Sequence, residues 1–349
     1  MTGRNGAGWV RWTASLAVPL AVLLAGCATA VAPPQQPPGS LDNPLQRDLV
    51  AAVTGEGAGP HLQALQRIAD QNGGNRASPG PGYEASVDYV AAALRDAGWV
   101  VDTPTYRVED EATGQQITLR NVVAQTRTGD PGRVVMAGAH LDSVPEGPGL
   151  NDNGTGVAAL LEIATRLGGA PQVTNAIRFG FWGSEEVDLN GSTEYVRALS
   201  DSDRQDLMLY LNIDMLASPN PGYFVQGGVG EDSEQSGPPG SAEVARVLVE
   251  QFAAAGVTAE TTEFDGESDY SAFVNAGVPS GGVLAGDAQR KSEEQAAEWG
   301  GRAEEDFDKC YHSACDRLDN LDPTALDRFT DAIAGTLAHF AMSTEPLDT

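Results

Sequence analysis

Basic residues are scarce in this sequence. It contains 21 Lys and Arg against 49 Asp and Glu, and its formal net charge is -28 over 349 residues. Such a charge repels nucleic-acid phosphates and anionic lipid headgroups, so it excludes a nucleic-acid-binding function and favours cationic partners. The acidic cluster at residues 304–306 is interpreted as solvated surface.

The start of the chain also lacks an apolar run of membrane-spanning length, because the apolar segment at residues 14–24 is too short for a permanent helix. It follows two arginines and precedes Leu24-Ala-Gly-Cys27, a lipobox. We therefore interpret residues 1–26 as a lipoprotein signal peptide, Cys27 as the acylated first residue of an exported, membrane-anchored protein that faces outward, and residues 27–43 as a flexible tether. The alternative is an ordinary signal peptide that is cleaved elsewhere, with an incidental cysteine.

Histidine is rare, with four residues, and two of them lie in segments that also carry acidic residues at predicted strand ends. Zinc accepts imidazole nitrogen and carboxylate oxygen, and a catalytic zinc site keeps a position open for water. Five ligands shared between two ions, with one bridging carboxylate, leave that position open on both. Each residue alone is more often a turn or strand-end residue, but their joint occurrence favours a metal site. The sequence therefore predicts a site for two zinc ions formed by His140, Asp152, Glu186, Asp214 and His312.

Two further acids adjoin this set. Glu185 precedes Glu186 and is the natural group to take a proton from water and pass it to a leaving amine. Its competing interpretation is a solvated helix start. Asp142, two residues after His140, is predicted to orient that imidazole through the free N–H of the ring, with a turn-stabilising role as the alternative.

These segments resemble family twenty-eight metallopeptidases of the bacterial leucyl aminopeptidase type, most closely the secreted streptomycete two-zinc form. The similarity runs from about His61 to Ala341. Besides the segments of the predicted ligands and Glu185, it includes Asn72-Gly-Gly-Asn-Arg-Ala, Pro81-Gly-Tyr-Glu-Ala-Ser-Val-Asp-Tyr-Val, Ser218-Pro-Asn-Pro-Gly-Tyr-Phe and Cys310-Tyr-His-Ser. Several matches in the same order are far more specific than any single one.

The resemblance implies a role for each residue of the site. One zinc would be bound by His140 and Asp214, the other by Glu186 and His312, with Asp152 as the bridge. Glu185 would be the general base, and Tyr311 would donate a hydrogen bond to the oxyanion. The implied substrates are peptides with a free and preferentially apolar amino-terminal residue, hydrolysed by a metal-bridged water.

The resemblance also places a pocket for the first side chain near Met215, Gly266, Leu284 and Tyr311. Two positions depart from the streptomycete pattern: Glu267 stands where that type has Arg, and Leu284 stands where it has Phe. Both departures put the substrate preference in doubt and leave the zinc chemistry untouched. Some relatives also bind calcium; Asp327 and Asp331 match part of that site, but its amino-terminal ligands have no counterpart that can be placed.

Apolar runs with strand character alternate with helical runs, which predicts a mainly parallel mixed sheet with helices on both faces, the zinc exopeptidase fold of the resemblance. The predicted strands are 122–125, 133–139, 176–182 and 207–214, and the predicted helices are 85–97, 157–167, 242–255 and 323–341. Residues 44–349 are assigned to one peptidase domain. Related peptidases can carry an inserted protease-associated domain, but the stretch between Tyr106 and Arg133 is too short to hold one.

Cysteine is the rarest of the chemically informative residues, with three in the chain. If Cys27 is acylated, Cys310 and Cys315 remain in an oxidising compartment, where a disulfide between them can persist. The closed loop would contain Tyr311 and His312 and would preorganise them. A cysteine-based metal site is the weaker alternative because no further cysteine is available.

Two other functions stay open at this point. One is a different enzyme on the same scaffold, such as a carboxypeptidase or a glutaminyl cyclase, and a cyclase would be expected to bind a single zinc. The other is a non-catalytic lipoprotein that binds peptides, which is disfavoured because Glu185 and all five predicted ligands are present. A monomer is expected in each case.

Overall fold

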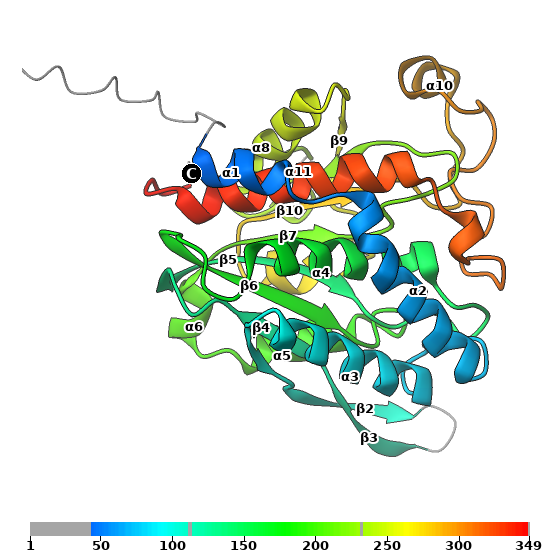
Figure 1. Cartoon of the computed structure of the whole chain (residues 1–349), viewed down its shortest axis with the longest axis horizontal. Coiled ribbons are helices and arrows are strands. Elements are labelled where there is room, and N and C mark those ends of the chain that lie inside the picture. The colour runs from blue at the N-terminus through cyan, green and yellow to red at the C-terminus, as the bar shows by residue number, and fades with distance from the viewer. Residues whose placement is uncertain (1–42, 111–113, 231–232, 348–349) are drawn as a thin grey trace, which may run out of the picture. The chain divides into compact units, whose positions relative to one another are not determined.

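The computed structural model describes residues 43–110, 114–230 and 233–347, which form an α/β fold (Figure 1). The predicted signal peptide, Cys27 and nearly all of the predicted tether lie outside the described residues. Each helix in the described part of the chain is too short or too polar to cross a membrane.

The described strands form one eight-stranded sheet, in the order β1-β4-β6-β5-β7-β10-β8-β9, and a separate two-stranded sheet. The strands of the large sheet are β1 (Val100–Asp102), β4 (Val122–Gln125), β5 (Asp130–His140), β6 (Asn175–Trp182), β7 (Leu207–Ile213), β8 (Phe224–Gln226), β9 (Glu260–Thr262) and β10 (Ser280–Leu284). The four central strands β6, β5, β7 and β10 are parallel neighbours, as are β8 and β9. Strands β1, β4 and β8 join their inner neighbours in antiparallel fashion. The prediction of a mainly parallel mixed sheet is confirmed.

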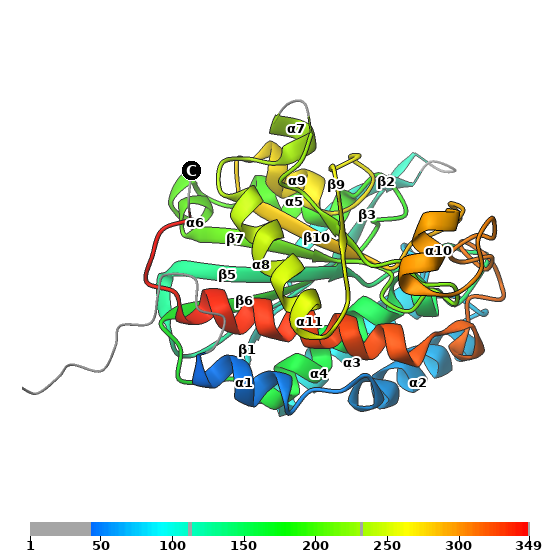
Figure 2. The ribbon, with the colours of Figure 1, turned by 90° about the horizontal axis from the view of Figure 1, so that it is seen from above.

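Helices cover both faces of the large sheet (Figures 1 and 2). One face carries α1 (Pro44–Val50), α2 (Gly55–Gln71), α3 (Pro81–Asp96), α4 (Thr155–Leu167), α8 (Ser241–Ala254) and α11 (Pro323–Met342). The other face carries α5 (Asn190–Ala198), α6 (Asp201–Gln205) and α9 (Tyr270–Asn275). The remaining helical segments are α7 (Ser233–Ser236), α10 (Glu293–Trp299), η1 (Leu150–Gly154) and η2 (Leu318–Asn320).

The central strands are almost continuously apolar because both of their faces are covered. All but one residue of β6 and all but one residue of β7 are buried, whereas the edge strands β1 and β9 contain no buried residue. The four predicted strands correspond to β4, β5, β6 and β7, and the four predicted helices to α3, α4, α8 and α11, with ends displaced by a few residues. The segment between Tyr106 and Arg133 contributes the small antiparallel sheet, β2 (Thr105–Asp110) with β3 (Gln115–Arg120), as well as β4.

Candidate metal centre

Three loops at the carboxyl ends of adjacent parallel strands supply most of the predicted site. His140 is the last residue of β5, Glu185 and Glu186 follow the end of β6, and Asp214 comes directly after β7. Parallel strands end at one edge of the sheet, where open α/β folds bind their ligands. Residues that are up to 74 positions apart in the chain, His140 and Asp214, are thereby brought within 3.4 Å of each other.

The other two predicted ligands, Asp152 and His312, come from irregular segments on either side of the carboxylate of Asp316. Asp152 lies in η1, before α4, and the backbone N–H groups of Asn151 and Asp152 donate to the carboxylate of Asp316 at 2.7 and 3.0 Å. His312 lies in the loop closed by a disulfide between Cys310 and Cys315, as predicted. The carboxylate of Asp316, next to that disulfide, thus ties the Asp152 turn to the His312 loop.

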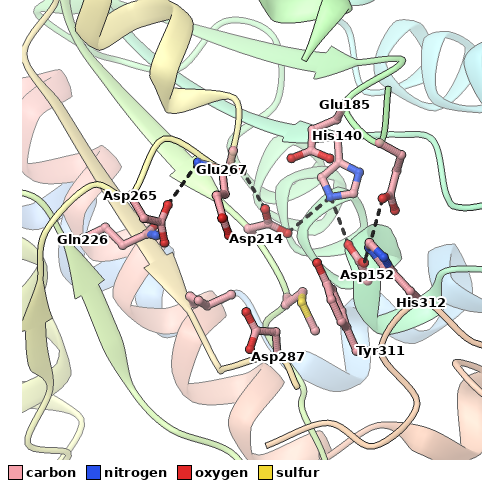
Figure 3. A pocket seen from close by; sticks show the side chains of 14 residues that line it. His140, Asp152, Glu185, Asp214, Gln226, Asp265, Glu267, Asp287, Tyr311 and His312 are labelled. Atoms are coloured by element: carbon pink, nitrogen blue, oxygen red, sulfur yellow. Dashed lines mark hydrogen bonds and ion pairs between the residues drawn. The ribbon is translucent and has the colours of Figure 1, made fainter. Parts of the chain in front are cut away.

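The five predicted ligands form two groups that share Asp152 (Figure 3). His140 Nε2 lies 3.1 Å from Asp152 Oδ1 and 3.4 Å from Asp214 Oδ1. His312 Nε2 lies 3.2 Å from Asp152 Oδ2 and 3.0 Å from Glu186 Oε2. One oxygen of Asp152 therefore faces each group, which is the arrangement that a bridging carboxylate needs.

Unpartnered buried atoms show that this donor set fits a cation. Glu186 Oε1 and Asp214 Oδ1 are buried without a hydrogen-bond partner among the described residues. Buried polar groups without partners are rare in folded proteins, and imidazole with carboxylate is a donor mixture that suits zinc.

The electrostatics of the centre point the same way. Burial opposes protonation of His140, but neighbouring carboxylates, first that of Glu185 and then that of Asp214, raise its pKa well above the ordinary value. Hydrogen bonds to Asp152 and Glu186 raise the pKa of His312 to about 10. The carboxylates thus favour protonation of both imidazoles, as expected of a cluster of negative charge that can bind a cation.

The two adjacent acids differ in surroundings. Burial, and then the charge of Asp152, raise the pKa of Glu186 to about 7. Burial and the negative charges of Asp269, Asp214 and Glu186 raise the pKa of Glu185 well above its ordinary value, although the imidazole of His140 opposes this shift. A carboxylate whose pKa is raised by its surroundings is a better proton acceptor than a free one, as a general base must be.

Asp142 is fully buried and its Oδ1 accepts the backbone N–H of Glu185 at 3.2 Å. The distance from Asp142 Oδ1 to His140 Nδ1 is 3.9 Å, which is beyond hydrogen-bond range. In this geometry Asp142 therefore holds the backbone of Glu185, the candidate base, and forms no hydrogen bond with His140. Burial raises the pKa of Asp142 to about 6.

The two groups line one pocket (Figure 3). It is lined by His140, Asp152, Glu185, Glu186, Asp214, Met215, Gln226, Asp265, Glu267, Ser268, Leu284, Asp287, Tyr311 and His312. The predicted pocket residues Met215, Glu267 and Leu284 are among them, whereas Gly266 is adjacent and donates its N–H to Tyr270. The ring of Tyr311 stacks on that of His312 with centroids 3.8 Å apart, and burial together with the charge of Asp152 raises the pKa of the Tyr311 phenol.

Sequence reasoning missed several residues of this centre. Ser268 donates to Asp214 Oδ2 at 2.7 Å and so holds a candidate ligand. Arg76 is fully buried and donates to the carbonyl oxygens of Leu141, Pro148 and Gly149, the backbone that carries His140 and leads to η1. The sequence around Arg76 indicates only the family resemblance, because nothing in its local pattern predicts that a guanidinium lies beneath the site.

A mixed α/β sheet that presents two groups of imidazole and carboxylate ligands at the carboxyl ends of its strands has the donor set of a zinc site. The model of peptidase family M28 matches residues 121–337, and the chain belongs to that family.

Relatives in sequence agree with this assignment, and solved structures share the fold. The chain is 54% identical over 220 residues to a probable lipoprotein aminopeptidase, LpqL, of Mycobacterium tuberculosis, covering 62% of this chain and 44% of the relative. It is 44% identical over 276 residues to leupeptin-inactivating enzyme 1 of Streptomyces exfoliatus, covering 78% and 59%. An aminopeptidase from Aneurinibacillus sp. strain AM-1 has the same fold, with a TM-score of 0.66 at 15% identity over 87% of this chain and 98% of that one. The chain spans about half the length of the curated relatives it matches.

Proposed function

We propose that this protein is a two-zinc aminopeptidase that removes amino-terminal residues from peptides. The observation that carries the proposal is the position of Asp152, whose two oxygens face separate groups of potential ligands beside the half-buried carboxylate of Glu185. Membership of family M28 and the aminopeptidase names of similar proteins support it.

His140, Asp214 and Asp152 would hold one ion, and Glu186, His312 and Asp152 the other. Zinc supplies Lewis acidity when bound, which lowers the pKa of water and polarises a carbonyl group. Both groups open into the same pocket, so a peptide bond bound there meets them together.

The side chains of the pocket would divide the remaining work. Glu185, held through its backbone by Asp142, accepts the proton of the attacking water and delivers it to the leaving amine. The phenol of Tyr311 is protonated at neutral pH, as any tyrosine is with an ordinary or raised pKa, and it donates to the oxygen that becomes negative. The surplus of carboxylates attracts the ammonium group of a free amino terminus.

We also propose that the protein is exported and anchored through an acylated Cys27, since the chain carries a lipobox and a similar protein is named a lipoprotein. Cys27→Ser should move the protein from the membrane fraction to the soluble fraction. Equal membrane retention of both forms would contradict the anchor.

Two neighbouring substitutions test the assignment of roles. Glu186→Ala should lower zinc content below two ions per chain, because it removes a ligand. Glu185→Gln should keep both ions and lower the turnover of a leucyl amide by about 10² to 10⁴, the range of general-base catalysis, because the amide cannot accept the proton. Asp188→Asn is a matched control: Asp188 is exposed, and its positive φ of 59° suits asparagine.

Zinc content by elemental analysis and rates on leucyl and acetyl-leucyl amides provide the readouts. Hydrolysis of the blocked substrate at the same rate would contradict an aminopeptidase. One zinc per chain, with conversion of glutaminyl peptides to a cyclic product, would favour a cyclase. Equal metal loss in the Glu185 and Glu186 variants would contradict the division of roles.

A further inference from the structure

The pocket contains more negative charge than the proposed chemistry uses. Seven carboxylates line it, and the three predicted ligands and Glu185 account for four of them. Two zinc ions would balance those four, and the α-ammonium group of the substrate would balance one of the three remaining charges, those of Asp265, Glu267 and Asp287. Two negative charges are then left without a counterion. None of the described residues that line the pocket is Lys or Arg, so the surplus must attract a cation from solution.

Two of these three carboxylates are held in position by the fold. Asp265 Oδ1 accepts the hydroxyl of Tyr270 and the backbone N–H of Glu267, the latter at 3.1 Å. Asp287 is half-buried and accepts the N–H of Gln289 at 2.8 Å. Burial raises the pKa of Asp287, and the negative charge of Asp265 adds to this shift. Ordered carboxylates lose less freedom when they bind a ligand than mobile surface ones do.

Gln226 supplies an independent sign of a ligand. It ends β8, it is 6% exposed, and its Oε1 is buried without a hydrogen-bond partner among the described residues. Its side chain nevertheless lines the same pocket. A buried acceptor without a donor is rare in a folded protein and is satisfied when a donor arrives from outside.

Figure 3 shows how these groups lie. Gln226 and Asp265 occupy the end of the pocket away from His312, and Asp287 lies between them and Tyr311. The apolar part of the lining consists of Met215 and Leu284. The pocket thus combines a short apolar wall with hydrogen-bond acceptors beyond it. This combination fits a long side chain with an aliphatic stem and a positively charged end, because such side chains bury the stem and keep the charged group among polar atoms.

We propose that Asp265, Asp287 and Gln226 form a subsite for the ammonium or guanidinium group of a lysine or arginine at the amino terminus of the substrate. The inference rests on the proposed function, since the first side chain enters the pocket only if the peptide bond after it reaches the metal centre. The proposal extends the apolar preference implied by the family resemblance. An apolar side chain would make the same contacts with Met215 and Leu284 but would form no hydrogen bond with the acceptors of the subsite.

The test compares lysyl and norleucyl p-nitroanilides, because norleucine reproduces most of the aliphatic stem of lysine and lacks the ammonium group. The zinc-loaded wild-type protein should show a higher kcat/KM for the lysyl substrate. Asp287→Asn and Gln226→Leu should each lower the ratio of lysyl to norleucyl kcat/KM by about tenfold, equivalent to about 1.4 kcal/mol. Glu263→Gln, an exposed acid outside the pocket lining, is the matched control and should leave the ratio at the wild-type value.

The outcomes separate the two proposals. Hydrolysis of neither substrate by the zinc-loaded protein would refute the aminopeptidase itself. Norleucyl hydrolysis that equals or exceeds lysyl hydrolysis, or an unchanged ratio in both pocket variants, would refute the cationic subsite and leave the aminopeptidase standing. A ratio that falls equally in Glu263→Gln would assign the preference to overall charge and would also overturn the subsite.

Discussion

Replacing Arg76 with methionine should destabilise the metal-free protein more than any surface substitution. The guanidinium of Arg76 is fully buried and donates to three carbonyl oxygens, at 3.0 Å to Pro148, at 2.6 Å to Gly149, and to Leu141. Methionine fills most of the same volume but offers no donor, so the three acceptors are left without this partner.

Two opposing effects set the magnitude. The Gly149 carbonyl keeps the N–H of Gly154 as a donor at 3.0 Å, so only the carbonyls of Leu141 and Pro148 lose their donor. Each buried acceptor that loses its donor costs about 1 to 3 kcal/mol, which gives a loss of about 2 to 6 kcal/mol for the two. Methionine is also easier to bury than a guanidinium, and burial does lower the pKa of Arg76. The negative charges of Asp142, Asp316, Asp152 and Glu186, however, act on Arg76 and offset that cost. Because the substitution also takes the nearby positive charge away from these acids, we expect the loss to prevail, at about 3 kcal/mol of unfolding free energy.

Urea unfolding in chelator, followed by zinc titration, measures both consequences. Arg76→Lys keeps the positive charge, but the single ammonium group of lysine cannot reach all three carbonyls. We therefore expect about half the loss seen for Arg76→Met. Zinc affinity should fall by about tenfold in Arg76→Met, because the loops that carry His140 and Asp152 lose their common anchor. An unfolding free energy of Arg76→Met within 0.5 kcal/mol of wild type, on the scale of about 1 kcal/mol per hydrogen bond, would refute this reasoning.

Three further predictions concern the His312 loop and the last helix. Tyr311→Phe should lower kcat by about 10² to 10³ with zinc content unchanged, as measured by steady-state kinetics and metal analysis, because one oxyanion donor is lost. Replacing Cys310 and Cys315 with Ser should cost only about 2 kcal/mol of stability, since the closed loop is short, and should lower kcat/KM more than the melting temperature suggests; unchanged kinetics would remove the loop from the mechanism. Burial and the charge of Asp327 raise the pKa of Asp331 to about 6, so this half-buried group favours folding below about pH 4, and that contribution is lost as pH rises through about 6. We therefore expect the unfolding free energy of Asp331→Asn, measured with urea in chelator, to rise by about 1 kcal/mol relative to wild type between pH 4 and pH 7; this value is reduced for solvent screening. A difference between variant and wild type that is the same at both pH values would contradict the pKa shift.

Local pattern was sufficient for the centre of the fold. Continuous apolar runs predicted β5, β6 and β7 because strands covered on both faces must be apolar throughout, and helical periodicity predicted α4 and α11. The strand β10 escaped prediction, because its sequence Ser-Gly-Gly-Val-Leu has little strand character and pairs with β7 and β8 only in the assembled sheet.

The sequence by itself also determined the types of ligand, since rare histidines close to acids at strand ends indicate imidazole and carboxylate ligands. It predicted the disulfide because the chain has no other cysteine beyond Cys27. Only the tertiary structure showed that the two oxygens of Asp152 face different imidazoles. It also placed Arg76 under the site and brought Gln226, Asp265 and Asp287 to one pocket. These juxtapositions depend on strand order and on the paths of separate loops, and no local periodicity encodes either of them.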